Sequence, residues 1–254
     1  MKVYALSDLH IDHADNREWL ERLPDAALRG DVLLLAGDVS DSLPRLRWAF
    51  TELTRRFLKV LYVPGNHELW LLRDDAADSF AKFDQVAALA AECGVSMAPF
   101  HCGPLSIVPL LSWYDFSFGE PTPELLAAWT DFRACRWPPG VGPAQVASRF
   151  HAMNAPYLQT RNRHVLSFSH FLPRPDLLPT PLGPIRALLL PVLGSSALEQ
   201  QLRQLRPQLH VFGHSHARLR CVHDGITYLN QAIGYPQERG GTPPALTSIF
   251  ELCL

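Results

Sequence analysis

The sequence predicts an α/β fold built around parallel β-strands. Three short and nearly continuous apolar runs, at 3–6, 32–36 and 60–63, are typical of strands that are buried on both faces. The stretch between the second and third runs carries apolar residues at helical spacing, and strands that alternate with helices indicate βαβ units. The length of 254 residues and the hydrophobic content of 47% fit one globular domain of this class.

Three helices are predicted around these strands. The first lies between the second and third strands and carries its apolar residues on one face, namely Leu46, Ala49, Phe50, Leu53 and Phe57. The second helix is predicted over 77–92. The third begins at Ser196, where Ser196 and Glu199 have the spacing of a capping box. The alternation of helices with strands supports the βαβ arrangement.

The second half of the chain is predicted to add further strands at 105–111, 164–168 and 209–212. The C-terminal part is predicted to form a β meander with strands at 218–222, 226–229 and 247–252. Asp224-Gly225 is a favourable hairpin turn within it. Two stretches fit the scheme less well and are interpreted as additions at the edge of a site. Residues 113–163 form an insertion with room for two short helices, and residues 171–195 form a Pro-rich loop.

Composition argues against several classes of function. The net charge is −2 and the pI about 6.6, so the chain has no strong basic field, and nucleic-acid binding is not indicated. The five cysteines, Cys93, Cys102, Cys135, Cys221 and Cys253, are scattered and form no C-x-x-C, which predicts a reducing cytoplasm. No signal peptide is recognised, no stretch approaches a membrane span, and no membrane partner is expected.

Four polar blocks each follow an apolar run: Asp8-Leu9-His10, Gly37-Asp38-Val39-Ser40-Asp41, Gly65-Asn66-His67-Glu68 and Gly213-His214-Ser215-His216. Their carboxylates, imidazoles and one carboxamide are ligand types that can hold two transition-metal ions side by side. In open α/β sheets, ligands collect at the carboxyl ends of the strands. The sequence therefore predicts a two-metal site at that edge of the fold.

The spacing within the blocks supports this prediction. Asp8 and His10 are two residues apart, and in an extended segment such side chains point the same way. The same holds for His214 and His216. Asp38 is the candidate bridge, because a carboxylate can join two cations that lie about 3.5–4 Å apart. The alternative for Asp38 is a helix N-cap, since a helix follows soon after it.

Taken with one further histidine, the blocks resemble the calcineurin-like metallophosphoesterase superfamily. The pattern of that family is D-x-H, G-D-x-x-D, G-N-H-[DE], a lone His and G-H-x-H, and the resemblance extends from Asp8 to His216. It implies a β-sandwich core flanked by helices in four α/β/β/α layers. It also implies a single domain over residues 1–254.

The resemblance implies two sets of metal ligands. Metal one would take Asp8, His10, Asp38 and His216, and metal two would take Asp38, Asn66, His170 and His214. His170 is the lone histidine of the pattern because it follows the apolar run at 165–168, whereas His164 precedes that run. Mixed nitrogen and oxygen ligands suit Mn, Fe, Co, Ni or Zn.

The resemblance also implies roles for two further residues. His67 neighbours the metal-facing Asn66, and its imidazole would protonate the leaving alkoxide, a contribution of about 10²–10⁴-fold. Asp41 would orient His67 or a ligand. A helix-capping role is the alternative for Asp41.

Substrate-contacting residues are sought in the insertion and beside the last block. Tyr114 and Arg136 bring an aromatic and a guanidinium group that could stack on a base or bind a phosphate. The alternative is that the side chains of the insertion pack it onto the core. Arg218, just after His216, is a further candidate for contact with phosphate.

The predicted function is hydrolysis of a small phosphate mono- or diester by a hydroxide that bridges the two ions. Protein phosphatases of the superfamily have Arg-Gly where Ser42-Leu43 follow Asp41 here, which disfavours that alternative. A nuclease would want a basic track, and none is evident in the sequence. A non-catalytic interaction scaffold is the third alternative, and the presence of every ligand disfavours it. The substrate, the metal pair and the oligomeric state are left open.

Overall fold

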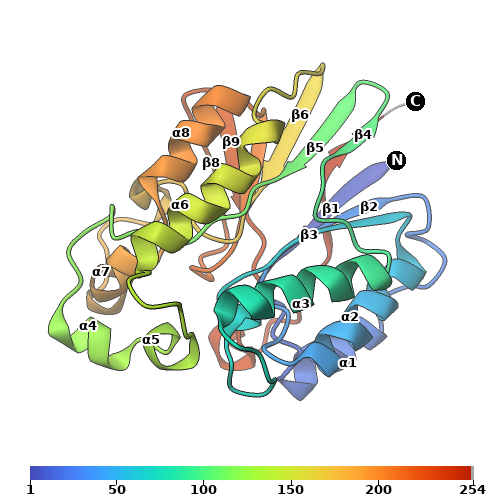
Figure 1. Ribbon diagram of the computed structural model, residues 1–254. Coiled ribbons are helices and arrows are strands. Elements are labelled where there is room, and N and C mark those ends of the chain that lie inside the picture. The colour runs from blue at the N-terminus through green and yellow to red at the C-terminus, as the bar shows by residue number, and fades with distance from the viewer. Residues whose placement is uncertain (253–254) are drawn as a thin grey trace.

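The computed structural model describes residues 1–252 and contains two β-sheets packed face to face, with helices outside both (Figure 1). The first sheet has the order β10 (Thr247–Glu251), β1 (Lys2–Leu6), β2 (Val32–Ala36) and β3 (Lys59–Val63). The second has the order β4 (Phe100–Cys102), β5 (Leu105–Pro109), β6 (His164–Phe168), β7 (Leu209–Phe212), β9 (Ile226–Asn230) and β8 (Leu219–His223). These layers confirm the predicted four-layer α/β fold.

The inner strands explain why the sequence shows continuous apolar runs. Side chains alternate between the two faces of a strand. In β2, Leu33 and Leu35 pack with the outer helices, whereas Val32, Leu34 and Ala36 belong to the apolar layer between the sheets. Both faces are therefore buried, and every residue of the strand is apolar.

The helices follow the amphipathic patterns of the sequence. On the first sheet lie α1 (Ala14–Glu21), α2 (Leu43–Arg56) and α3 (Ser79–Glu92) (Figure 1). The predicted apolar face of α2 is buried against this sheet. On the second sheet lies α8 (Ser196–Leu205), and α6 (Pro143–Asn154) runs beside it, where Asn154 Nδ2 donates a hydrogen bond to Gln201 Oε1.

Two local predictions are wrong, namely the place of the last strand in the C-terminal meander and the N-cap of α8. β8 and β9 form the expected hairpin, and Asp224 and Gly225 both have positive φ, as a two-residue turn requires. β10, however, leaves this hairpin and pairs antiparallel with β1, where it covers an edge that would otherwise expose unpaired backbone groups. The N-cap of α8 is Ser195 rather than Ser196, because the Ser195 hydroxyl accepts from the Ala197 N–H.

The predicted insertion contains more helix than expected. Residues 113–163 hold α4 (Pro123–Ala128) and α5 (Asp131–Ala134) as well as α6, and the Pro-rich stretch 171–195 includes α7 (Pro184–Leu189). The aromatic side chains of this region form a cluster of their own with Phe80 and Phe83 of α3. The insertion therefore packs against both outer layers.

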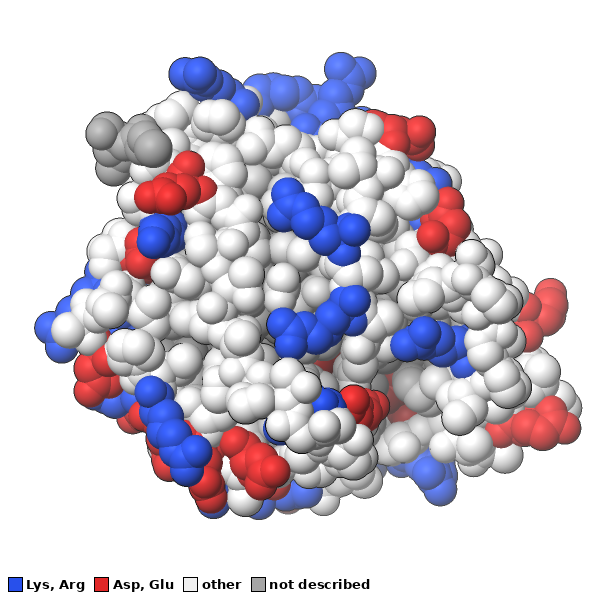
Figure 2. Space-filling view, turned by 180° about the vertical axis from the view of Figure 1, so that it is seen from behind, with Lys and Arg blue, Asp and Glu red and all other residues white. Residues whose placement is uncertain are grey.

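The surface and the helices add little to the question of partners. On the face seen in Figure 2, Lys and Arg form small separate groups with neutral surface between them. Among residues 1–252, no helix is both long and apolar enough to cross a membrane. Cys93, Cys102, Cys135 and Cys221 are free thiols, and Cys253 lies outside the described residues.

Candidate metal centre

The predicted ligands meet where strands of both sheets end. Each of them follows the carboxyl end of β1, β2, β3, β6 or β7. Among residues 1–252, three groups have ligand atoms that all lie within 4.8 Å of one another: Asp8 with His10 and His216, Asp38 with His170 and His214, and His10 with Asp38 and His67. The first two match the predicted metal sites and are called the first and second groups below. These residues come from the predicted blocks and the lone His170.

The two groups adjoin each other at Asp38. In the first, His216 Nε2 lies 3.3 Å from Asp8 Oδ1 and 3.2 Å from His10 Nε2. Asp38 Oδ2 lies 3.9 Å from His10 Nε2 on one side and 3.5 Å from His170 Nε2 on the other. Asp38 thus stands between the groups, as a bridging carboxylate would.

In the second group, His170 Nε2 lies 3.1 Å from His214 Nδ1 and 3.2 Å from Asn66 Oδ1. The other nitrogen of each ring faces a carbonyl oxygen, because His170 Nδ1 lies 2.9 Å from Ala36 O and His214 Nε2 lies 3.1 Å from Val192 O. Those nitrogens must carry the protons, since a carbonyl can only accept. The two inward nitrogens therefore face each other with lone pairs, an arrangement that suits a cation between them.

The first group has a similar outer contact. His216 Nδ1 lies 2.6 Å from Glu238 Oε2, so its N–H donates to that carboxylate and Nε2 is directed inward. Contacts of this kind fix the tautomer and the orientation of a metal-binding imidazole. The donor set therefore fits a bound transition metal in both groups.

The backbone at the ligands differs from the extended form that we predicted. Asp8, His10, Asp38, His214 and His216 have φ between 41° and 64°, in the left-handed region. Non-glycine residues in that region cost about 1–3 kcal/mol each, and such strain gathers at functional sites. The side chains converge because the chain turns sharply at each strand end, and not, as predicted, because alternate residues of an extended segment point the same way.

The glycines of the motifs are required by space. A Cβ at Gly37 would lie 2.6 Å from His170 Nδ1, and one at Gly213 would lie 2.8 Å from Asp8 Oδ2. A Cβ at Gly65 would collide with the Asp38 carboxylate. The backbone thus approaches the ligands so closely that no side chain fits.

Glu68 holds two of the ligand loops together, a role that the sequence analysis did not find. Its buried carboxylate accepts hydrogen bonds from the backbone N–H of Asp38, Val39, Ser40 and Gly65. Burial raises the pKa of Glu68 to about 7, although these four donors act in the opposite direction. The last position of the G-N-H-[DE] block was the available signal.

His67 lies at the mouth of the centre. The backbone N–H of His67 donates to Asp38 Oδ1 at 3.1 Å, and the imidazole Nε2 lies 3.7 Å from Asp38 Oδ2. The ring stacks on Trp70 with centroids 3.7 Å apart, and the side chain keeps 16% of its exposure. Burial, together with the neighbouring His170, lowers the pKa of His67 to about 3.

The other predicted site residues have different partners. The Asp41 carboxylate pairs with Arg73 Nε at 3.0 Å rather than with His67. The N-cap of α2 is Ser42, so Asp41 does not occupy that capping position. Tyr114 is 1% exposed within the aromatic cluster of the insertion.

The two predicted arginines are exposed and bind other parts of the chain. Arg136 donates to the carbonyls of Ala76 and Ala77, before α3. Arg218 donates to Gln231 Oε1 at 3.3 Å. The contacts of Arg136, like the burial of Tyr114, agree with the packing alternative, whereas a substrate contact by Arg218 stays a prediction.

A cleft of about 360 Å³ opens beside the metal centre. It is lined by His10, Asp12, His13, Asp41, His67, Trp70, Arg73, Thr130, Tyr235 and Gln237. Tyr235 also stacks on His10, with ring centroids 4.5 Å apart. The sequence analysis did not find Tyr235, Glu238 or Arg73, although the first two follow the carboxyl end of β9, where ligands are expected.

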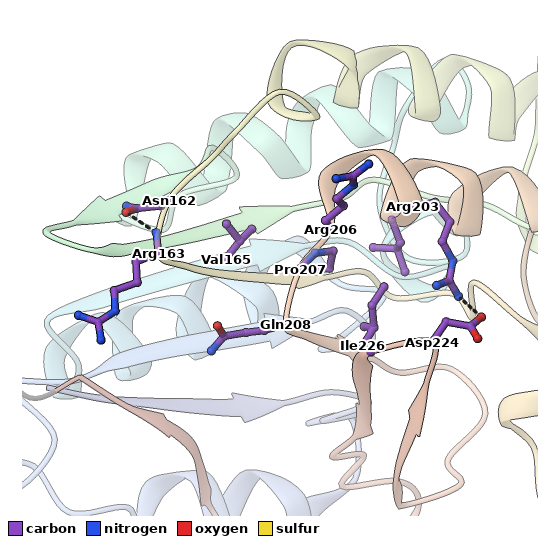
Figure 3. A pocket seen from close by; sticks show the side chains of 11 residues that line it. Asn162, Arg163, Val165, Arg203, Arg206, Pro207, Gln208, Asp224 and Ile226 are labelled. Carbon is purple, nitrogen blue, oxygen red and sulfur yellow. Dashed lines mark hydrogen bonds and ion pairs between the residues drawn. The ribbon is translucent and has the colours of Figure 1, made fainter.

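A second hollow of about 590 Å³ lies at the amino ends of β6, β7 and β9, opposite the metal centre (Figure 3). None of the predicted ligands lines it. Arg163 and Arg206 point in different directions, and Arg203 pairs with Asp224 (Figure 3). These side chains do not converge on one point, so the metal centre remains the candidate functional site.

The chain belongs to the calcineurin-like phosphoesterase family, whose model matches residues 1–218. This family match agrees with the class of protein that the sequence predicted. The chain is 39% identical over 126 residues to [acyl-carrier-protein] phosphodiesterase PptH of Mycobacterium tuberculosis (strain ATCC 25618 / H37Rv). The match covers 46% of this chain and only 38% of that relative.

A solved structure resembles nearly the whole chain. The crystal structure of phosphopantetheinyl hydrolase (PptH) from Mycobacterium tuberculosis superposes with a TM-score of 0.80 and 25% identity. The match covers 98% of this chain and 95% of that one.

Removal of the Asp38 carboxylate is expected to release metal from both groups, because Asp38 lies between them. Elemental analysis of Asp38→Ala, purified without chelator, should show loss of bound transition metal. Asp12→Ala is the matched control, since Asp12 lines the cleft but belongs to neither group. A full metal complement in Asp38→Ala would contradict the ligand assignment.

Proposed function

We propose that this chain is a two-metal phosphodiesterase that cleaves a phosphopantetheine-type diester of a carrier protein. The observation that carries the proposal is the pair of donor groups on either side of Asp38. Asp8, His10, Asp38 and His216 would hold one ion, and Asp38, Asn66, His170 and His214 the other. Bound Mn, Fe, Co, Ni or Zn ions supply Lewis acidity and make hydroxide available near neutral pH.

His67 is the proposed general acid. Its backbone is held by Asp38 Oδ1 and its ring by Trp70, so the imidazole is presented to the cleft in one orientation. Burial lowers the pKa of His67 and so favours the neutral imidazole. An anionic phosphate at hydrogen-bond distance favours the protonated imidazole, which can then donate to the departing oxygen.

The charges of the cleft favour a diester. Arg73 is the one cation among the charged Lys, Arg, Asp and Glu side chains that line the cleft. It is already paired with Asp41 at 3.0 Å and lies 3.7 Å from Asp12. Apart from the two proposed ions, the lining of the cleft therefore offers no unpaired Lys or Arg for the second negative charge of a monoester, whereas a diester carries only one negative charge at its phosphate.

The substrate class comes from the relatives. The protein with 39% identity is named an [acyl-carrier-protein] phosphodiesterase, and the similar solved structure is named a phosphopantetheinyl hydrolase. The presence of every motif ligand disfavours a scaffold. Ser42-Leu43 after Asp41 disfavours a protein phosphatase, and the small separate basic groups of the surface offer no support for a nuclease. A cytoplasmic location stays a prediction from the cysteines.

Loss of the His67 imidazole should depend on the leaving group. With a poorly acidic alcohol as leaving group, His67→Ala is expected to lower kcat by about 10²–10⁴-fold while bound metal is retained. The loss should shrink with a nitrophenolate leaving group, which departs without a proton. Steady-state kinetics of the metal-loaded protein on both substrate types tests this. Equal losses on both would argue that His67 is a ligand or a structural residue.

The balance of charge in the cleft can be altered at Asp41. Wild-type protein should prefer bis-nitrophenyl phosphate over nitrophenyl phosphate. Asp41→Asn frees the charge of Arg73 and should shift relative kcat/KM toward the monoester by roughly fivefold, as expected for an electrostatic change of about 1 kcal/mol. Asp25→Asn, an exposed acid paired with Arg55, is the control. An unchanged ratio would remove the electrostatic argument for a diester.

A further inference from the structure

We propose that Asp131 of α5 is a positioning residue that orients the Asn66 carboxamide toward the second metal group. The inference rests on the proposed function, because it takes Asn66 as a ligand. It makes the insertion at 113–163 a part of the metal centre, although none of its residues is a ligand.

The contacts of Asp131 are directed toward the metal centre. Its side chain is buried, and Oδ1 accepts hydrogen bonds from Asn66 Nδ2 at 2.9 Å and from Trp70 Nε1 at 2.7 Å. Oδ2 accepts from Trp129 Nε1 at 2.7 Å. In the described chain, these bonds join Asp131 to side chains outside α5, so capping of that four-residue helix does not account for them.

A carboxamide needs such a partner because its two ends are nearly the same in shape. Metal binding requires the oxygen, whereas a rotation of about 180° would present the NH₂ group instead. An ionised carboxylate only accepts hydrogen bonds, so it selects the NH₂ end. The bond from Nδ2 to Asp131 therefore leaves Asn66 Oδ1 toward His170 Nε2, at 3.2 Å.

The same carboxylate supports two other walls of the site. Trp70, which donates to Oδ1, is the ring on which His67 stacks. Trp129, which donates to Oδ2, meets the His214 ring edge to face with centroids 5.8 Å apart. Asp131 thus binds the proposed ligand Asn66 directly. It also binds the two indole rings that contact the proposed acid His67 and the proposed ligand His214.

This arrangement predicts a selective effect on metal binding. In Asp131→Asn, an NH₂ group replaces one acceptor oxygen, so the side chain can present either an acceptor or a donor to Asn66. The orientation of Asn66 is then no longer fixed, because either end of its carboxamide can find a partner. The affinity of the second metal group should fall by about 10–100-fold, the usual effect of changing an outer partner of a ligand. The first group, which does not contain Asn66, should change by less than about threefold.

Metal binding can be measured without reference to activity. Zn²⁺ is titrated into metal-free protein in competition with a chromogenic chelator, for wild type, Asp131→Asn, Asn66→Ala and Glu124→Gln. Thermal unfolding of each metal-free protein is measured in parallel. Glu124→Gln is the matched control, because it makes the same change from carboxylate to carboxamide at an exposed position of α4 in the insertion. It should bind both ions within about threefold of wild type.

The expected result is weaker binding of one ion in Asp131→Asn, at an unfolding temperature close to that of wild type. Unchanged binding of both ions would overturn the inference. So would equal weakening of both sites with a large fall in thermal stability, since that pattern indicates a structural role. If Asn66→Ala binds both ions normally, Asn66 is not a ligand, and the inference fails for that reason. A wild-type protein that binds fewer than two ions would instead contradict the two-metal proposal itself, and the inference about a second metal would fall with it.

Discussion

The metal centre depends on one constraint. The atoms of its buried imidazoles and carboxylates that would coordinate a metal must stay free and point inward. Imidazoles and carboxylates that are removed from water must find partners, or their burial is costly. In this centre, the outer atoms of His170, His214 and His216 are satisfied by Ala36 O, Val192 O and the Glu238 carboxylate. The inner nitrogens of the neutral His170 and His214 rings then have no hydrogen to share with one another, which leaves them available to a cation.

Two of these three outer partners come from parts of the chain outside the motif strands. The segment that leads to α8 provides Val192 O, and the stretch after β9 provides Glu238. Glu68 acts on the backbone instead, because its carboxylate joins the Asp38 loop to Gly65 through four N–H donors. Asp38 and Asn66 are therefore held by a common support and cannot shift independently.

The sequence was sufficient for the inner strands of both sheets and for the set of residues that converge. Continuous apolar runs such as 32–36 indicate buried parallel strands, and the carboxyl ends of parallel strands must meet at one edge. The short motif spacings could therefore be assigned to one site. Their backbone conformation could not, because the left-handed φ of Asp8 or His214 results from the turn that the whole fold imposes at a strand end.

The partners of the ligands escaped prediction for a different reason. Glu238 follows His216 by 22 residues, and Asp131 follows Asn66 by 65, with no pattern in between. β10 is a similar case, because its pairing with β1 joins opposite ends of the chain. Such contacts depend on the tertiary arrangement and leave no local periodicity.

In the insertion at 113–163, the residues that the sequence suggested for the site differ from the residue that the structure places beside a ligand. Its sequence, rich in Trp and Arg, favoured substrate contact and packing about equally. The structure gives Tyr114 and Arg136 packing contacts, whereas Asp131, which the sequence analysis passed over, lies against Asn66. The indole N–H groups of Trp70 and Trp129 donate to the same Asp131 carboxylate, so both rings are tied to the metal centre. The aromatic composition of the insertion is therefore explained in part by the need to enclose one buried acid beside the metal ligands.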